Sequence, residues 1–163
     1  MTEQKLTDFT FSDTGITVKL QKVSPYLAND IADSNPPPEP PLVEVDYGQP
    51  RGKVKEKNWQ SPEYIKLVNE HDSKVNDIYN RLLVLRGVVE IEDENWQEKV
   101  KEYRKLIKEE TGNDVVEKSD KLVYILRIAL GTMDDFHDLM KAITRRSYPT
   151  AEAVEAAKES FQG

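Results

Sequence analysis

The side chains best able to perform chemistry are two histidines, His71 and His137, and an acidic cluster around the second of them. His137 is followed directly by Asp138, and Asp134 and Asp135 lie just before it. A His-Asp pair, with a second histidine upstream and a further aspartate downstream, could hold a divalent metal for hydrolysis. His71 could be the upstream histidine, but no aspartate follows Asp138 in the chain. The ligand set is incomplete, and we expect no metal site.

The same residues have simpler structural explanations. His71 falls within a repeating apolar pattern, where a histidine is expected to lie in a core or an interface. Asp134 and Asp135 fit the first turn of a helix, where the helix dipole favours negative charge. The sequence also has no cysteine, no Gly-x-Ser-x-Gly turn and no phosphate-binding arrangement of its seven glycines. We therefore predict a protein that is not an enzyme and uses no cofactor.

Composition narrows the range of partners. The chain has 163 residues and a net charge of −7, and an acidic surface repels the phosphates of nucleic acids. The longest apolar run, residues 122–130, is interrupted by Arg127 and is too short to cross a bilayer. The first residues lack the apolar stretch of a signal peptide. These features predict a soluble intracellular protein whose partners are neither nucleic acid nor membrane.

The N-terminal part is expected to contain β-structure. Residues 6–23 alternate apolar and polar side chains on both sides of the turn Ser12-Asp13-Thr14-Gly15, a pattern typical of a β-hairpin. Ser24 and Pro25 are common residue types at the start of a helix, so a short helix is expected at 25–33.

A proline-rich segment follows this helix. Five prolines occupy six positions between residues 36 and 41, and Val43, Val45 and Tyr47 alternate directly after them. The segment could be a linker, a ligand for a proline-binding partner or a rigid strap across the protein. It lacks the glycine and serine of flexible linkers, and a polyproline II conformation would carry the chain about 15–20 Å. We predict an ordered strap whose strand at 42–47 pairs with the hairpin or with a neighbouring subunit.

After residue 60 the pattern becomes that of helices. Residues 49–60 are expected to form an exposed loop, and a helix is expected from Ser61-Pro62 to Gly87. Further helix starts are indicated at Asn95, Ser119, Thr132 and Pro149. The helix that begins at Ser119 is nearly all apolar, so we expect it to be the most buried one.

Together these patterns predict a mainly α fold with a small β part. It consists of an N-terminal β-hairpin plus one added strand, followed by a body of five or six helices. The expected organisation is residues 1–48 for the hairpin, short helix and proline-rich strap with its strand, 49–60 for a loop, and 61–163 for a helical domain.

The helix expected at 61–87 carries a seam of apolar positions in alternating steps of four and three residues, called here the heptad seam. Its members are Tyr64, Val68, His71, Val75, Ile78, Leu82 and Leu85. The seam can pack within the chain, or it can contact a partner or a second copy of the chain. Trp59 stands in a polar stretch and can likewise pack locally or face a partner. The residues we predict for partner binding are Val68, Val75, Ile78, Leu82, Val43, Val45, Tyr47 and Trp59.

Several stretches occur in an order found in a known group of proteins. FTFSDTGITVKLQKVSP at Phe9–Pro25 precedes the proline run and VDYG at Val45–Gly48. Leu130-Gly131-Thr132 with Asp135-Phe136, and then RRSYPT at Arg145–Thr150, follow near the end. This arrangement resembles small proteins encoded in the tail region of long-tailed bacteriophages, generally assigned as tail assembly chaperones. The resemblance runs over most of the chain, through short motifs.

The resemblance implies a non-enzymatic role. Such proteins hold the long, helical, aggregation-prone tape measure protein in the host cytoplasm and bring tail tube subunits to it. A homo-oligomer would be compatible with this role. The alternative is a structural tail or neck subunit that stays in the phage particle and is located in the virion tail.

Overall fold

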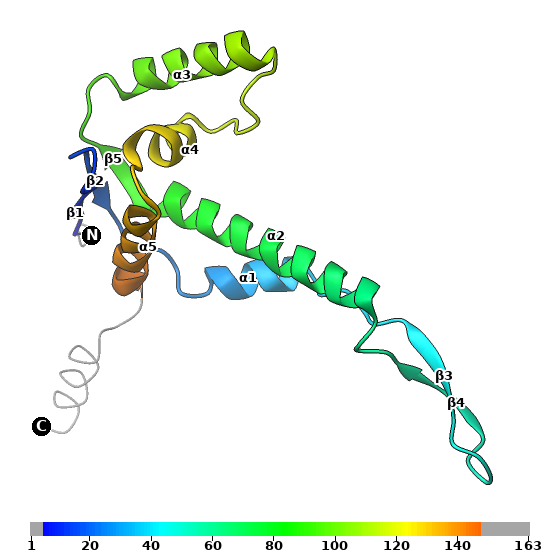
Figure 1. Cartoon of the computed structure of the whole chain (residues 1–163). Coiled ribbons are helices and arrows are strands. Elements are labelled where there is room, and N and C mark those ends of the chain that lie inside the picture. Colours follow the sequence, from blue (N-terminus) through cyan, green and yellow to red (C-terminus); the bar gives the residue numbers. More distant parts are fainter. Residues whose placement is uncertain (1–4, 148–163) are drawn as a thin grey trace, which may run out of the picture. The chain divides into compact units, whose positions relative to one another are not determined.

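The computed structural model describes residues 5–147 and is mainly α-helical, with about 52% helix and 16% strand (Figure 1). Two small antiparallel sheets accompany the helices, and the N-terminal strands form a hairpin that is extended by one further strand. The predicted fold class is confirmed. The described chain divides into two compact units: Tyr26–Tyr79 is one, and the described residues on either side of it, 5–25 and 80–147, form the other.

The sheet of the flanking unit has the antiparallel strand order β1-β2-β5, with β1 (Thr7–Thr10), β2 (Thr17–Leu20) and β5 (Val88–Ile91). The expected pairing of residues 42–47 with the hairpin is wrong, because β5 pairs with β2 and residues 42–46 form a separate sheet with residues 53–57. Val18 and Val88 are fully buried, so this pairing covers apolar surface of both strands. The backbone N–H of Gln21 donates to the carbonyl of Gly87 (2.8 Å), which extends the ladder at one end.

The core of this unit combines buried residues of these strands with helices that the sequence indicates. α2 (Pro62–Gly87) ends in it, and α3 (Trp96–Thr111), α4 (Asp120–Val123) and α5 (Met133–Ser147) follow. The expected buried helix is present, with Leu122 to Ile125 and Ala129 at most 1% exposed. It is not α-helical throughout, since α4 continues as the π-helix η1 (Tyr124–Ala129). The N–H of Leu130 donates to the carbonyl of Ile125, five residues back, at 3.0 Å.

Helix starts agree with the sequence where a hydroxyl side chain can accept a backbone hydrogen bond. Ser61 accepts from the N–H of Tyr64, Ser119 from Leu122 and Thr132 from Asp135, at 3.2–3.4 Å. Two expected caps are wrong. α1 (Leu27–Ser34) begins after Tyr26, so Ser24 lies outside it, and the side chain of Asn95 makes no capping hydrogen bond.

Two glycines end helices for different reasons. Gly112 has a φ of 75° and ends α3 in the left-handed conformation that favours glycine. Gly87 is the last residue of α2, and it has no positive φ. A Cβ at this position would lie 2.9 Å from Cγ2 of Ile143, so α5 packs where a side chain would be. The sequence therefore indicates the end of α2 correctly, but the glycine there makes room for Ile143 and does not adopt a left-handed conformation.

The unit Tyr26–Tyr79 contains α1, the two-stranded sheet of β3 (Leu42–Asp46) and β4 (Lys53–Lys57), and the first part of α2. Within it, the proline-rich segment connects α1 to β3 without regular secondary structure (Figure 1). Pro40 in this segment is buried. The expected loop at 49–60 is wrong, because β4 lies inside it and is the partner of β3. Four of the helical segments expected after residue 60 lie in the described part of the chain, whereas the one expected from Pro149 lies outside it.

Candidate functional site

The hairpin of β3 and β4, called here the arm, has two faces of different character. Residues directly opposite each other in the register share a face, and successive residues alternate between faces. One face is charged, with Glu44 opposite Lys55 and Asp46 opposite Lys53. Its remaining pair is Leu42 and Lys57.

The other face of the arm is apolar and partly exposed. It carries Val43 and Val45 on β3 and Val54 on β4, with Glu56 opposite Val43, and Tyr47 directly follows β3, where its N–H continues the ladder to Gly52. Val43 is 42% exposed and Tyr47 is 44% exposed. A two-stranded sheet is marginally stable in water, and its apolar face gains stability when it is covered. This face is therefore a candidate surface for a partner.

Polar contacts fix the tyrosine at the tip of this face. The Tyr47 hydroxyl donates to Glu56 at 2.5 Å, and this hydrogen bond raises the pKa of Tyr47. The guanidinium carbon of Arg51 lies 4.3 Å from the ring centroid, a cation–π distance. The aromatic ring is thereby held in place while much of its surface remains accessible.

Trp59 follows β4 and lies in a turn. Its ring contacts Tyr64 edge to face, with ring centroids 5.9 Å apart, and Nζ of Lys57 lies 5.8 Å from the Trp59 ring. The tryptophan is still 60% exposed. Local packing thus accounts for part of its surface and leaves the rest for contact with a partner.

The heptad seam is half-buried at each of its seven positions along α2. Within the unit Tyr26–Tyr79, Nε2 of His71 lies 2.7 Å from the carbonyl of Asn35, just after α1. An open groove of about 240 Å³ runs beside the seam, lined by Ala28, Ile31, Asp72, Val75, Asn76 and Tyr79. The chain therefore covers each side chain of the seam only in part and leaves the rest of its surface accessible.

The predicted partner residues fall into separate groups. The structure brings Val43, Val45 and Tyr47 onto one face of the arm, and it places Val68, Val75 and Ile78 along α2 in the same unit. Leu82 belongs to the other unit, next to the buried Leu83 and Val84. Val54 belongs to the same face of the arm but is not among the predicted partner residues, because the sequence predicts a loop at residues 49–60. The signal was present in the alternation Lys53-Val54-Lys55-Glu56-Lys57.

The acidic cluster considered for metal binding has a structural explanation. Asp135 is 2% exposed, and its carboxylate accepts hydrogen bonds from the backbone N–H and the hydroxyl of Ser12 (3.1 and 2.5 Å) and from the N–H of Asp13 (3.3 Å). The Ser12 hydroxyl is the main cause that lowers the pKa of Asp135. Asp135 thus ties the turn of the N-terminal hairpin to the start of α5. Among the residues that the structure describes, no group of three His, Asp or Glu side chains could hold a metal.

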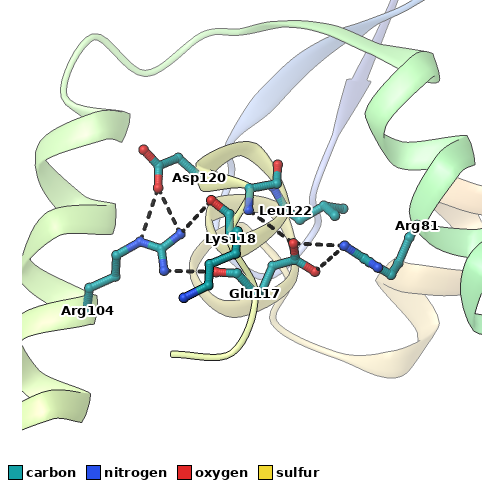
Figure 2. A network of polar contacts seen from close by, with 7 residues as sticks. Arg81, Arg104, Glu117, Lys118, Asp120 and Leu122 are labelled. Carbon is teal, nitrogen blue, oxygen red and sulfur yellow. Dashed lines mark hydrogen bonds and ion pairs between the residues drawn. The ribbon is translucent and has the colours of Figure 1, made fainter. Parts of the chain in front are cut away.

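A second polar network holds the segment before α4 (Figure 2). Arg104 of α3 donates to the carboxylate of Asp120 (2.8 Å) and to the carbonyls of Glu117 and Lys118, while the Glu117 carboxylate pairs with Arg81 of α2 at 2.9 Å. An open cleft of about 350 Å³ beside this network is lined by Arg81, Val116, Glu117, Lys118 and Arg127. The two arginines therefore hold the segment between α2 and α3 by hydrogen bonds and ion pairs.

No protein-family model matches the sequence, and neither a curated protein nor a solved structure matches the chain. Across residues 5–147, no helix is both long enough and apolar enough to span a membrane.

Proposed function

We propose that this chain is a non-enzymatic tail assembly chaperone of a long-tailed bacteriophage, which binds the tape measure protein and assists assembly of the tail tube. The sequence resemblance suggests this role. The structural observation that supports it is the heptad seam, which stays half-buried along the whole of α2. A helix face of this kind can bind a partner protein whose own long helices carry apolar faces.

The face available on α2 is wider than the seam itself. Ile65 and Leu67 flank the seam near the start of the helix, and about half of each side chain is exposed, at 48% and 51%. Covering apolar area stabilises a complex by roughly 25 cal/mol per Å² before the costs of association are subtracted. Seam and flanking positions together present a broad apolar stripe that a partner helix could cover.

The test is co-expression with the tape measure protein encoded by the same phage. The chain should raise the soluble fraction of that protein, and Val75→Glu combined with Ile78→Glu should remove this effect. The matched control is Ser73→Glu, an exposed position on the same stretch of α2 that lies off the seam. Far-UV circular dichroism of each variant shows whether it is folded.

The outcomes separate an interface from a core. A folded seam variant that no longer solubilises the tape measure protein supports the proposal. Unfolding of the seam variant alone assigns the seam to the core of this chain and removes the structural support for the proposal. A folded seam variant that works as well as the wild type contradicts it.

The proposed setting is the host cytoplasm during assembly, with the tail tube protein as a second partner. A structural tail or neck subunit would instead remain in the finished particle. A mass-spectrometric inventory of purified virions distinguishes the two, because an assembly chaperone leaves the particle. Detection in amounts close to those of other tail subunits would contradict the chaperone role.

A further inference from the structure

The arm has two outer edges, and the hydrogen bonds between β3 and β4 show which backbone N–H and C=O groups point toward each edge. The N–H of Tyr47 donates to the carbonyl of Gly52 (3.0 Å), and the N–H of Asn58 donates to the carbonyl of Pro41 (2.7 Å). Backbone groups in an antiparallel strand point to alternate sides, so residues 43 and 45 also face β4. The N–H and C=O groups of Leu42, Glu44 and Asp46 therefore point to the outer edge of β3. By the same alternation, those of Lys53, Lys55 and Lys57 point to the outer edge of β4.

These two edges differ in charge. The outer edge of β4 carries three lysines, a common device against pairing with a like strand. Two acidic residues, Glu44 and Asp46, occupy the outer edge of β3. Glu44 lies 3.6 Å from Nζ of Lys53 within the arm, but both side chains are more than half exposed, so this pair is weak and leaves both groups accessible.

Only one combination of edges brings unlike charges together. Two β4 edges would place lysines against lysines, and two β3 edges would gather their acidic residues. A β3 edge against a β4 edge, in the register already present within the arm, sets Glu44 opposite Lys55 and Asp46 opposite Lys53. It also sets Val45 opposite Val54, which continues the apolar face from one arm to the next.

We propose that the arm joins copies of this chain head to tail, the outer edge of β3 in one copy pairing antiparallel with the outer edge of β4 in a second copy. The two surfaces in this contact differ, so the association is heterologous and leads to a closed ring or an open chain of copies. Each contact supplies main-chain hydrogen bonds to edges that have no strand partner in residues 5–147. This inference goes beyond chaperone activity and involves different residues from the heptad seam.

Sedimentation velocity of the full chain across concentrations of about 1 µM to 1 mM tests the proposal. The wild type should associate with increasing concentration. Glu44→Lys and Lys55→Glu should each weaken association about tenfold, because each places like charges opposite one another at every contact. A 1:1 mixture of the two variants should recover association, since the new lysine of one then faces the new glutamate of the other.

The mixture separates contacts between copies from effects inside one hairpin. Each variant has the same mismatch within its own arm whether it is alone or mixed, so only a contact between copies can be restored by mixing. A wild type that stays monomeric at all concentrations overturns the proposal. Variants that associate as well as the wild type, or a mixture no better than its components, also overturn it.

A second variant covers the case in which a charge reversal prevents folding. Glu44→Pro removes an N–H that points outward, so it blocks the edge of β3 without removing a bond to β4, and proline is tolerated at such edge positions. Glu44→Gln removes the charge but keeps the N–H, and it serves as the matched control. Loss of association in Glu44→Pro, with most of it kept in Glu44→Gln, supports the proposal. Equal association of both variants and the wild type overturns it.

Discussion

Replacement of Gly87 by alanine tests how the end of α2 packs against α5. A Cβ at position 87 would lie 2.9, 3.0 and 3.1 Å from Cγ2, Cδ1 and Cγ1 of Ile143. Ile143 is fully buried, so its side chain has little room to move away. We therefore expect Gly87→Ala to destabilise the protein, although alanine is the better helix former.

The magnitude follows from two opposing effects. Alanine in place of glycine favours a helix by up to about 1 kcal/mol, and by less at its last residue. Overpacking of a buried site costs about 1–3 kcal/mol. The net change should be a loss of about 1–2 kcal/mol in the free energy of unfolding. Ile143→Ala removes all three opposing atoms and should cost about 2–5 kcal/mol by itself through the cavity that it leaves.

The double variant makes the argument specific. With Ile143→Ala in place, the alanine at position 87 no longer clashes and fills part of the cavity, so the double variant should be at least as stable as Ile143→Ala alone. Ile143→Val is the matched control, because it keeps Cγ2 and should give little relief. Urea unfolding followed by circular dichroism at 25 °C measures all the variants. Additive losses in the double variant, or a Gly87→Ala protein as stable as the wild type, would refute the reasoning.

Three further changes have defined outcomes. The buried Tyr124 hydroxyl donates to Asp93 at 2.6 Å and, after Lys99, helps to lower the pKa of Asp93, so Tyr124→Phe should cost about 1–3 kcal/mol. A carboxyl group whose pKa is lower in the folded protein stabilises the fold at a pH above its pKa in the unfolded chain, and this stability is lost as the pH falls. The cost of Tyr124→Phe should therefore be larger at pH 7 than at pH 3 in urea unfolding, and an equal cost at both pH values would contradict this prediction. Gly131→Ala places a Cβ on the Asp13 side chain and should lower the melting temperature by several degrees, an effect absent if the turn adapts freely. Pro40→Gly exposes a buried site and loosens the strap, so it should also lower the melting temperature, whereas unchanged stability with fast NMR relaxation across residues 34–42 would indicate a loose tether.

Local chemistry made much of the helical structure predictable. Ser61, Ser119 and Thr132 each supply a hydroxyl that accepts a hydrogen bond in the first turn, and all three mark helix starts in the structure. The apolar run after Ser119 identifies the most buried helix, because it contains so few polar side chains that most of it can be buried. These features depend on residues close in sequence, so they can be inferred without knowledge of the fold.

The pairing of strands was not predictable in the same way. Residues 42–47 suit a strand by their alternation and residues 88–91 by their three β-branched side chains, and only the tertiary fold decides that 88–91 joins the hairpin. Three lysines make the segment of β4 so polar that its sequence suggests a loop, although the segment forms a strand. The burial of Asp135 depends on Ser12, which lies 123 residues earlier in the chain. Each of these outcomes arises from contacts between distant parts of the sequence.

The proposed self-association through the arm and the proposed partner binding through the heptad seam would have different consequences for function. Pairing of arms suits a chaperone and a structural tail subunit equally well, because both can act as assemblies of several copies. It therefore cannot decide between them. A test of the heptad seam can distinguish the two roles, since only a chaperone requires an apolar helix face that binds the tape measure protein and then releases it. Glu44 and Lys55 lie in the arm, whereas Val75 and Ile78 lie on α2, so variants at one location leave the residues of the other unchanged. A chain whose copies dissociate in Glu44→Pro but which still keeps the tape measure protein soluble would show that the two properties are independent.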